Sequence, residues 1–516
     1  MTTSATPYTK LTIGSYTLLS RILGFLRDLI IARMFGANIG TDAFWVAFTL
    51  PNLTRRLAGE GVFSLAIVPV ITANQNHNNY TVLKSFINKL VGTLIAILIP
   101  TTVLGILFAS YIVTILAPGF VTEPARFALT TTMLQILMPA IACMILTACI
   151  GAILHSHQRF QIPAFTPILL NIGIISAAWW LTPYLHQPII ALAWGVLIGS
   201  GMQLALQIFA LTNLKLLPKP RISFKDPKIQ QTIKLLVPAL ISTAVTHFGL
   251  IFDAVLLSFL PIGSVSWLYY AKRLTEFPQG LLGTTIATVL LPQLATLYNS
   301  NISQAIPNSA LFSKTIDHAL QGAFILGIPA TIGLWMLATP IISTLFYSDK
   351  FTITDINMAA ASLKIYALGL PAYLSIKILA PAYYAIQDTK TSTRIALITG
   401  MCHILLGIVL IIPLAHLGLA WASTVAANIY GMLLCRGLIR DRLYKLNSSW
   451  MQLVLRVGCA SACMGLFIIF GGAISVNWLE FNTIQSIKTL TVYILGSMVI
   501  YIVVLFGIGF RLQQIR

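Results

Sequence analysis

Long apolar segments separated by short polar breaks occupy almost the whole chain. A helix that crosses the hydrocarbon core of a bilayer needs about 20 mostly apolar residues, and cutting the sequence at its polar and Pro/Gly-rich breaks yields fourteen such segments. They lie at residues 11–35, 42–72, 83–116, 125–154, 160–182, 189–213, 229–259, 264–298, 312–346, 357–385, 393–413, 417–438, 450–474 and 487–510. The pattern predicts an all-α polytopic membrane protein with about 14 transmembrane helices. Charged residues interrupt the second and the eighth segment.

The composition agrees with this class. Of the 516 residues, 57% are hydrophobic and 9% are charged, whereas a soluble domain carries about 25% charged residues. The first ten residues, MTTSATPYTK, are polar and no small-residue cleavage site follows them, so we expect the first helix to be retained. The six cysteines lie in apolar runs and never as a CxxC pair, which favours apolar filling over a metal site or a disulfide.

The net charge of +19 is distributed as membrane topology requires. With the N-terminus in the cytoplasm, 19 of the 32 basic residues fall in the even-numbered connections and at the termini. The opposite side receives three, Arg126, Lys350 and Lys488. The positive-inside rule therefore predicts that both termini are cytoplasmic. The chain has no clustered basic face or basic domain, so we expect no nucleic-acid partner.

A weak internal repeat predicts the domain organisation. The stretch GFLRDLIIARMFGA ahead of FSLAIVPVI resembles GLIFDAVLLSFLPI ahead of IATVLLPQL. Helices 1 and 2 thus match helices 7 and 8 in the same orientation, which indicates a parallel repeat about an axis along the membrane normal. We expect two pseudo-symmetric six-helix lobes, at residues 1–217 and 218–445, and a C-terminal helix pair at residues 446–516.

Several charged side chains lie inside the predicted helices. An arginine at the centre of a membrane helix costs about 2.5–3.5 kcal/mol on insertion scales, so these side chains must face water or one another. Helical spacing allows local pairs: Arg56 with Glu60, and Glu276 with Lys272 or Arg273. One interpretation is that such pairs only lock helices together.

An excess of basic residues favours a second interpretation. Helices 1, 2, 7 and 8 hold six bases, without the peripheral Arg33, against five acids, of which Asp42 and Asp253 can lie outside the cluster. Surplus cations around a water-filled cavity suit an anionic ligand, above all a phosphate that arginine can grip with two hydrogen bonds. We therefore predict a central cationic cavity.

Helix breaks lie next to these arginines in both repeats. Pro51, Gly59 and Gly61 surround one pair of arginines, and the stretch EFPQGLLG follows Arg273. Interrupted helices at corresponding places of two repeats indicate a transporter's binding site. Ordinary proline kinks are the alternative.

Three long motifs resemble a known family. SRILGFLRDLIIARMFGANIGTDAFWVAFTLPNLTRRLAGEGVFSLAIVPVI resembles the N-terminal signature of the MurJ (MviN) lipid II flippases, of the multidrug/oligosaccharidyl-lipid/polysaccharide (MOP) exporter superfamily. YYAKRLTEFPQGLLGTTIATVLLPQLA and IKILAPAYYAIQDTKTSTRIA extend the match along the chain. The resemblance implies 14 helices, two lobes around a central cationic cavity, and a C-terminal helix pair that forms a hydrophobic groove for a lipid tail.

The resemblance also implies roles for individual residues. The substrate-binding set, expected to hold a pyrophosphate, is Arg21, Arg27, Arg55 and Arg273. The gating or orienting set is Asp28, Asp42 and Glu276. Second-tier candidates are Arg56, Glu60, Lys272, Lys377, Gln387 and Asp388. The chain departs from the family pattern at Lys272, where relatives often have Asp, and at Thr49, where some have Lys.

The expected function is transport without bond breaking. The resemblance implies that a lipid-linked peptidoglycan precursor, an anionic polyprenyl-pyrophosphate glycolipid, moves from the inner to the outer leaflet of the bacterial cytoplasmic membrane by alternating access. The transporter would act as a monomer, without a metal or cofactor. The chain has no Walker-type GxxxxGK[ST] run, so the membrane potential or a cotransported ion is the expected energy source.

Three alternatives remain open at this point. A flippase for another undecaprenyl-pyrophosphate-linked glycan would share the anionic substrate. A MATE-like antiporter for drugs or cations would be expected to have an acidic cavity. A membrane glycosyltransferase or phosphatase would need an Asp-rich metal motif, and the sequence has none.

Overall fold

The computed structural model describes residues 7–59, 61–75, 80–280, 290–298, 309–447, 449–473 and 476–511. Within these ranges the regular secondary structure is entirely helical, without a strand. The predicted all-α class is confirmed. In the described part of the chain, each of the fourteen apolar segments overlaps at least one helix, and several of them are broken into two or three helices.

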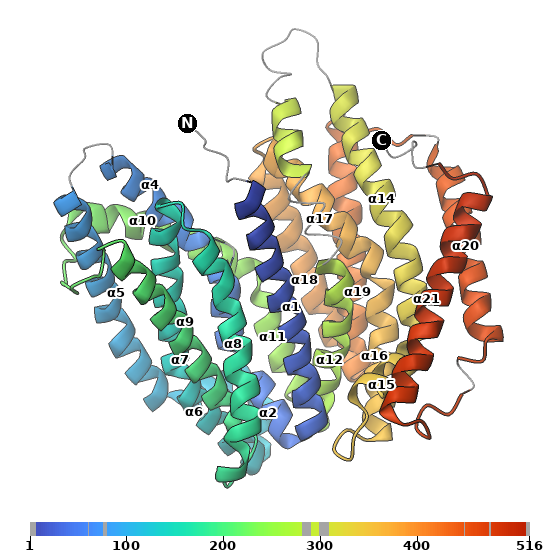
Figure 1. The fold of residues 1–516 in the computed structure, drawn as a ribbon, viewed down its shortest axis with the longest axis horizontal. Coiled ribbons are helices and arrows are strands. Elements are labelled where there is room, and N and C mark those ends of the chain that lie inside the picture. Colours follow the sequence, from blue (N-terminus) through green and yellow to red (C-terminus); the bar gives the residue numbers. More distant parts are fainter. Residues whose placement is uncertain are drawn as a thin grey trace. The chain divides into compact units, whose positions relative to one another are not determined.

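The chain forms two compact units, Met1–Val265 and Ser266–Arg516, which appear in blue to green and in green to red in Figure 1. The repeat predicts lobe boundaries after residues 217 and 445. Compact units need not coincide with repeat lobes, so this division stays a prediction. The basic stretch around residue 217 packs on its neighbours: the Arg221 N–H donates to the Asn88 carbonyl (3.0 Å), and Lys89 pairs with Asp226 (2.6 Å).

Eleven α-helices lie in the described part of the first unit. They are α1 (Pro7–Phe35), α2 (Ile39–Ala47), α3 (Thr49–Gly59), α4 (Val62–Gln75), α5 (Tyr80–Leu107), α6 (Ala109–Leu116), α7 (Pro124–Ser156), α8 (Gln161–Trp180), α9 (Ile190–Asn213), α10 (Pro227–Thr246) and α11 (Phe248–Leu257). Short 3-10 helices η1 (Pro118–Thr122) and η2 (Thr182–Tyr184) join α6 to α7 and α8 to α9.

The segment predicted as one helix at 42–72 consists of parts of three helices. Asn38 caps α2: its side chain accepts from backbone N–H groups, and the Asn38 N–H donates to the Thr41 hydroxyl. This capping box fixes where α2 begins. Gly61 has a φ of +75°, a conformation that glycine adopts without strain, and it separates α3 from α4.

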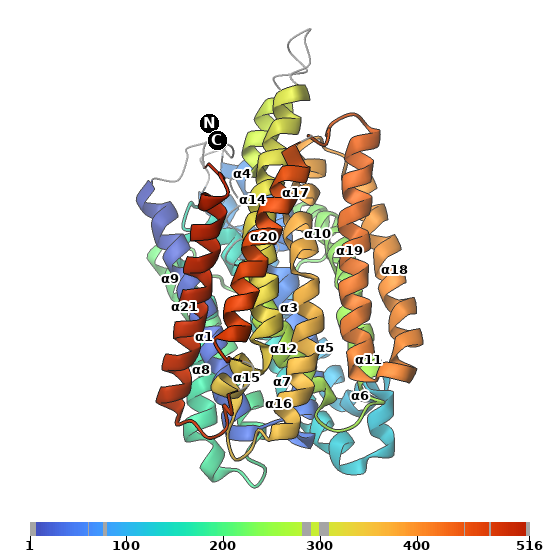
Figure 2. The same cartoon turned by 90° about the vertical axis from the view of Figure 1, so that its right-hand side faces the viewer.

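The second unit contains long helices and a bent pair (Figure 2). They are α12 (Ser264–Pro278), which begins at the end of the first unit, α14 (Ser309–Met336), α15 (Ala338–Phe346), α16 (Ile353–Leu368), α17 (Leu370–Ala385), α18 (Thr389–Leu414), α19 (His416–Arg440), α20 (Ser449–Phe470) and α21 (Thr483–Gly507). The C-terminal pair α20 and α21 packs together, and α20 lies against α14.

Among the described residues, nine helices are long and apolar enough to cross a membrane. These are α5, α7, α8, α9, α14, α18, α19, α20 and α21, and the pair α16–α17, bent by 43°, makes a tenth if it forms one span. The chain is therefore a multi-pass membrane protein. The count of 14 spans stays a prediction.

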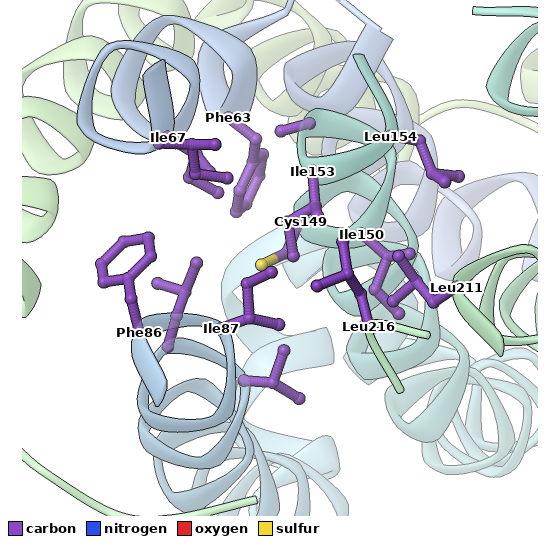
Figure 3. Packing of buried hydrophobic residues seen from close by; sticks show 14 of the residues in the cluster. Phe63, Ile67, Phe86, Ile87, Cys149, Ile150, Ile153, Leu154, Leu211 and Leu216 are labelled. Carbon is purple, nitrogen blue, oxygen red and sulfur yellow. The ribbon is translucent and has the colours of Figure 1, made fainter. Parts of the chain in front are cut away.

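An apolar core holds the helices of the first unit together (Figure 3). Phe63 and Ile67 of α4 face Ile87 of α5 and Ile153 of α7. The cysteine Cys149 lies among them with 1% of its surface exposed and carries no disulfide. It therefore fills apolar space, as the sequence predicts for the cysteines. Packing of this kind holds α4, α5 and α7 together.

Candidate functional site

Helix α1 carries a buried ion pair. Arg27 and Asp28 are 8% and 1% exposed, and the Arg27 Nη2 lies 2.5 Å from the Asp28 Oδ1. The Arg27 Nε also donates to this oxygen, at 2.9 Å. Neighbouring residues on a helix do not normally face each other, so the long arginine side chain must fold back to reach Asp28.

Asn171 of α8 completes this group. Its Oδ1 accepts from the Arg27 Nη1 at 3.2 Å. Its Nδ2 donates to the Ser20 carbonyl of α1 (3.1 Å) and to the Pro167 carbonyl of α8 (3.2 Å). The three side chains therefore tie α1 to α8. In this state Arg27, a predicted ligand residue, is engaged with the protein's own groups.

Asp42 lies in a separate, fully buried group. Its Oδ2 is 2.7 Å from the Arg126 Nη2, and both side chains are 0% exposed. The same oxygen accepts from the Gly263 N–H at 2.7 Å. Gly263 directly precedes α12, which carries Arg273. The Asp42 carboxylate thus joins α2, the first turn of α7 and the segment that leads into α12.

Arg126 is a functional candidate that the sequence did not reveal. The charge pattern places it in an outer connection, yet it lies in the first turn of α7 with no exposed surface. Its Nη1 donates to the Leu260 carbonyl (3.4 Å) and lies 3.6 Å from Glu123. Its guanidinium stands 3.9 Å from the centre of the Phe120 ring, a favourable cation–π distance. No local spacing signals a pair whose members are 84 residues apart.

The two arginines of α3 differ in exposure. Arg55 is exposed and its Nη2 donates to the Asn52 Oδ1 at 2.7 Å, whereas Arg56 is half-buried. Glu60, the predicted partner of Arg56, lies outside the described residues. Arg21 of α1 is also half-buried. Exposed or half-exposed guanidinium groups of this kind can bind a phosphate with two parallel hydrogen bonds.

The predicted pair on α12 is confirmed. The Arg273 Nη1 lies 3.3 Å from the Glu276 Oε2, and the two side chains are 27% and 33% exposed. The i, i+3 spacing places them on one helix face. Lys272 is half-buried beside them. This pair keeps exposed surface, unlike the two buried ion pairs of the first unit.

The second-tier residues after α17 form a tight turn. Lys377 is exposed on α17, and Gln387 has a φ of 61°. Asp388 caps α18 by accepting from the Thr391 N–H at 3.0 Å. Hydrogen bonds from Thr391, from its side chain first and its backbone second, hold the pKa of Asp388 below its usual range. The observed role of Asp388 is therefore to cap α18.

The structure thus brings the candidates together in three groups: Arg27 with Asp28, Asp42 with Arg126, and Arg273 with Glu276. A cationic cavity between two lobes stays a prediction. Within the described residues, no cluster of three His, Cys, Asp or Glu side chains could hold a metal ion.

Comparisons with known proteins agree with the motif resemblance. The sequence model of the family described as "Lipid II flippase MurJ" matches residues 31–489. A protein of Vibrio cholerae described as a probable lipid II flippase MurJ is 35% identical over 511 residues, which cover 98% of this chain and 96% of that protein.

Solved structures extend this agreement to the fold. A lipid II flippase MurJ in an inward closed conformation aligns with a TM-score of 0.80 and 26% identity, over 96% of this chain and 98% of that chain. An inward-facing multidrug resistance transporter of the MATE family, in the MOP superfamily, aligns with a TM-score of 0.69 and 11% identity, over 84% and 98%. At that identity the second match shows a shared fold alone.

Proposed function

Because the chain belongs to the MurJ lipid II flippase family, we propose that it carries lipid II from the inner to the outer leaflet of the bacterial cytoplasmic membrane. The observation that supports this most strongly is the family match along nearly the whole chain. The relatives are named as flippases, so the chain belongs among transporters rather than enzymes.

The pyrophosphate of the substrate is the group that the arginines would hold. Arg55 and Arg273, which keep exposed surface, would bind its oxygens first. Arg21 and Arg27 would join them when the helices rearrange, and Arg27 would exchange Asp28 for a phosphate oxygen. Such an exchange replaces one charge-assisted pair with another of similar strength.

The acidic residues would then control the rearrangement. Asp28 and Glu276 compete with the substrate for Arg27 and Arg273, which keeps these arginines oriented while the site is empty. Asp42, through Arg126 and the Gly263 N–H, would hold one closed arrangement of the segment that precedes α12. Opening would require this buried group to separate or to gain water.

The proposal needs no cofactor. Two negative charges that move outward from a negative interior gain roughly 4–5 kcal/mol per 100 mV. The membrane potential is therefore a sufficient driving force for the charged headgroup, and a cotransported ion is the alternative. We further propose that the chain acts as a monomer with both termini in the cytoplasm, as its basic residues indicate.

A flippase for another polyprenyl-pyrophosphate glycan remains the second candidate, since it would use the same arginines. A MATE-like antiporter has less support, because that likeness rests on fold at 11% identity.

Reconstitution tests the function directly. Purified protein in vesicles should move labelled lipid II, and movement should become faster when an imposed potential favours the outward passage of anions. In cells depleted of their own lipid II flippase, the chain should restore lipid II at the outer surface. Failure in both assays would contradict the proposal. A flipping rate that does not change with the imposed potential would contradict only the membrane potential as the energy source. If the reconstituted protein moved another polyprenyl-pyrophosphate glycan but not lipid II, the second candidate would be favoured.

Removal of a single arginine that keeps exposed surface should reduce flipping without loss of folded protein. Arg55→Ala and Arg273→Ala each remove a charged donor, whose hydrogen bond contributes about 1.5–3 kcal/mol, so we expect roughly tenfold slower flipping or more. The matched control is Arg440→Ala, because Arg440 is exposed at the end of α19 and its side chain lies beside Asp441. Equal rates for all three variants would show that Arg55 and Arg273 do not bind the substrate.

A further inference from the structure

The second unit contains a cavity that the predicted transport site does not use. It has a volume of about 390 Å³ and lies among α14, α15, α16 and the segment between α20 and α21. Its walls are formed by Trp335, Met336, Thr339, Pro340, Ser343, Ile353, Ile356, Asn357, Lys364, Val476, Asn477, Trp478 and Leu479. The walls therefore combine apolar side chains with a few polar groups, as is typical of a small-molecule site.

Lys364 is the one charged side chain of this lining. It lies eleven residues after the start of α16, which is roughly 16 Å along the helix axis. Side chains on a helix lean toward its N-terminus, so the lysine stem is directed toward the turn of Asn357. No hydrogen bond or ion pair of Lys364 is found within the described part of the chain. Lys364 is half-buried, and a lysine within a helix of a membrane protein requires water or an anion beside it.

The other polar groups suit an anion. Thr339 and Asn357 bring one hydroxyl group and one amide to the same cavity, whereas the Ser343 hydroxyl donates to the carbonyls of Thr339 and Pro340. No carboxylate belongs to the lining of the cavity. The Asn477 amide is engaged with Glu480, which lies outside the lining. One cation with neutral donors balances one negative charge. A pyrophosphate carries more, so this cavity is not a second copy of the proposed transport site.

The apolar walls indicate that the anion is part of a lipid. Met336, Ile353 and Ile356 belong to the lining, and so do Trp335 and Trp478. Tryptophan is enriched where headgroups meet the hydrocarbon region. A volume of about 390 Å³ can enclose a glycerophosphate group but lies near the small end of ligand sites.

We propose that this cavity binds the headgroup of an anionic glycerophospholipid such as phosphatidylglycerol, with Lys364 on the phosphodiester. The Thr339 hydroxyl and the Asn357 amide complete the hydrogen bonds, and the part of the acyl chains nearest the headgroup lies on the apolar wall. The bound lipid connects α16 to residues 476–479 and so stabilises the second unit. The proposal does not depend on the transport function.

Native mass spectrometry with defined lipids tests the site. The protein is purified in detergent and supplied with equal amounts of phosphatidylglycerol and phosphatidylcholine. We expect one phosphatidylglycerol to be retained preferentially, because phosphatidylcholine carries its own cation. Lys364→Gln should lower this retention about tenfold or more, as the loss of a charged hydrogen-bond donor implies, and Lys364→Arg should keep it.

Lys488→Gln is the matched control, because Lys488 is an exposed lysine of α21 outside the cavity lining. As a second measurement, phosphatidylglycerol should raise the unfolding temperature of the unmodified protein and of Lys488→Gln but not of Lys364→Gln, since a ligand stabilises the state that binds it. Equal retention by Lys364→Gln and the unmodified protein would overturn the proposal. Equal retention of both lipids, or an equal loss with Lys488→Gln, would also overturn it.

Discussion

Replacing Arg126 with Leu, or Asp42 with Ala, is expected to lower the free energy of unfolding by about 3–5 kcal/mol. Both side chains are 0% exposed, and their charged atoms are 2.7 Å apart. Removal of either one leaves the other charged in a low-dielectric surrounding. Removal of Asp42 also takes the acceptor from the Gly263 N–H. The measurement is the folded fraction after heating in detergent, followed by size-exclusion chromatography.

A double variant shows whether the loss of stability comes from breaking the pair of charges. Asp42→Asn with Arg126→Met removes both charges and keeps an acceptor for Gly263, so we expect it to be more stable than either single variant. The exposed pair of Arg440 and Asp441, 3.0 Å apart, is the control: solvent screens it, and Arg440→Ala should leave the unfolding temperature unchanged. Single variants as stable as this control would show that the buried pair does not hold the first unit together. If the variant with both Asp42→Asn and Arg126→Met is stable but no longer flips lipid II, the proposed gating role of Asp42 is supported.

The sequence predicts the fold class and the helix-bearing regions well because burial in lipid demands long apolar runs. It is less informative about where those runs break. The stretch from residue 42 to 72 is apolar enough to look continuous, yet α2 ends at Ala47, and the positive φ of Gly61 separates α3 from α4. Such breaks depend on capping and backbone geometry, which hydropathy does not record.

The candidate site is predictable only where partners are close in sequence. Arg273 and Glu276 are three residues apart, and helical spacing alone predicts their pairing. Arg126 pairs with Asp42 because α7 packs on α2. Nothing in the local sequence of Arg126 distinguishes it from a lysine or arginine of an outer connection. Lys364 likewise stands out only when the lining of its cavity is known. Charge counts can suggest a polar interior but cannot assign its pairs.

The pair on α1 allows a test that separates helix locking from substrate binding. Arg27→Leu and Asp28→Leu should each lower stability by about 3–5 kcal/mol, because each breaks a buried ion pair from one side only. The double variant should regain most of this loss, since apolar residues can replace a buried ion pair at little cost. Asn171 keeps its hydrogen bonds to Ser20 and Pro167 in all three variants.

The flipping rate of the double variant then identifies the role of Arg27. If Arg27 binds the pyrophosphate, the double variant should fold and yet flip lipid II at least tenfold more slowly than the unmodified protein, as expected for a lost charge-assisted contact. Arg33→Met is the control, because Arg33 is a half-buried arginine in the last turn of the same helix and outside the predicted site. Normal flipping by a stable double variant would leave Arg27 and Asp28 as a helix lock alone, and substrate binding would then have to rest on Arg21, Arg55 and Arg273.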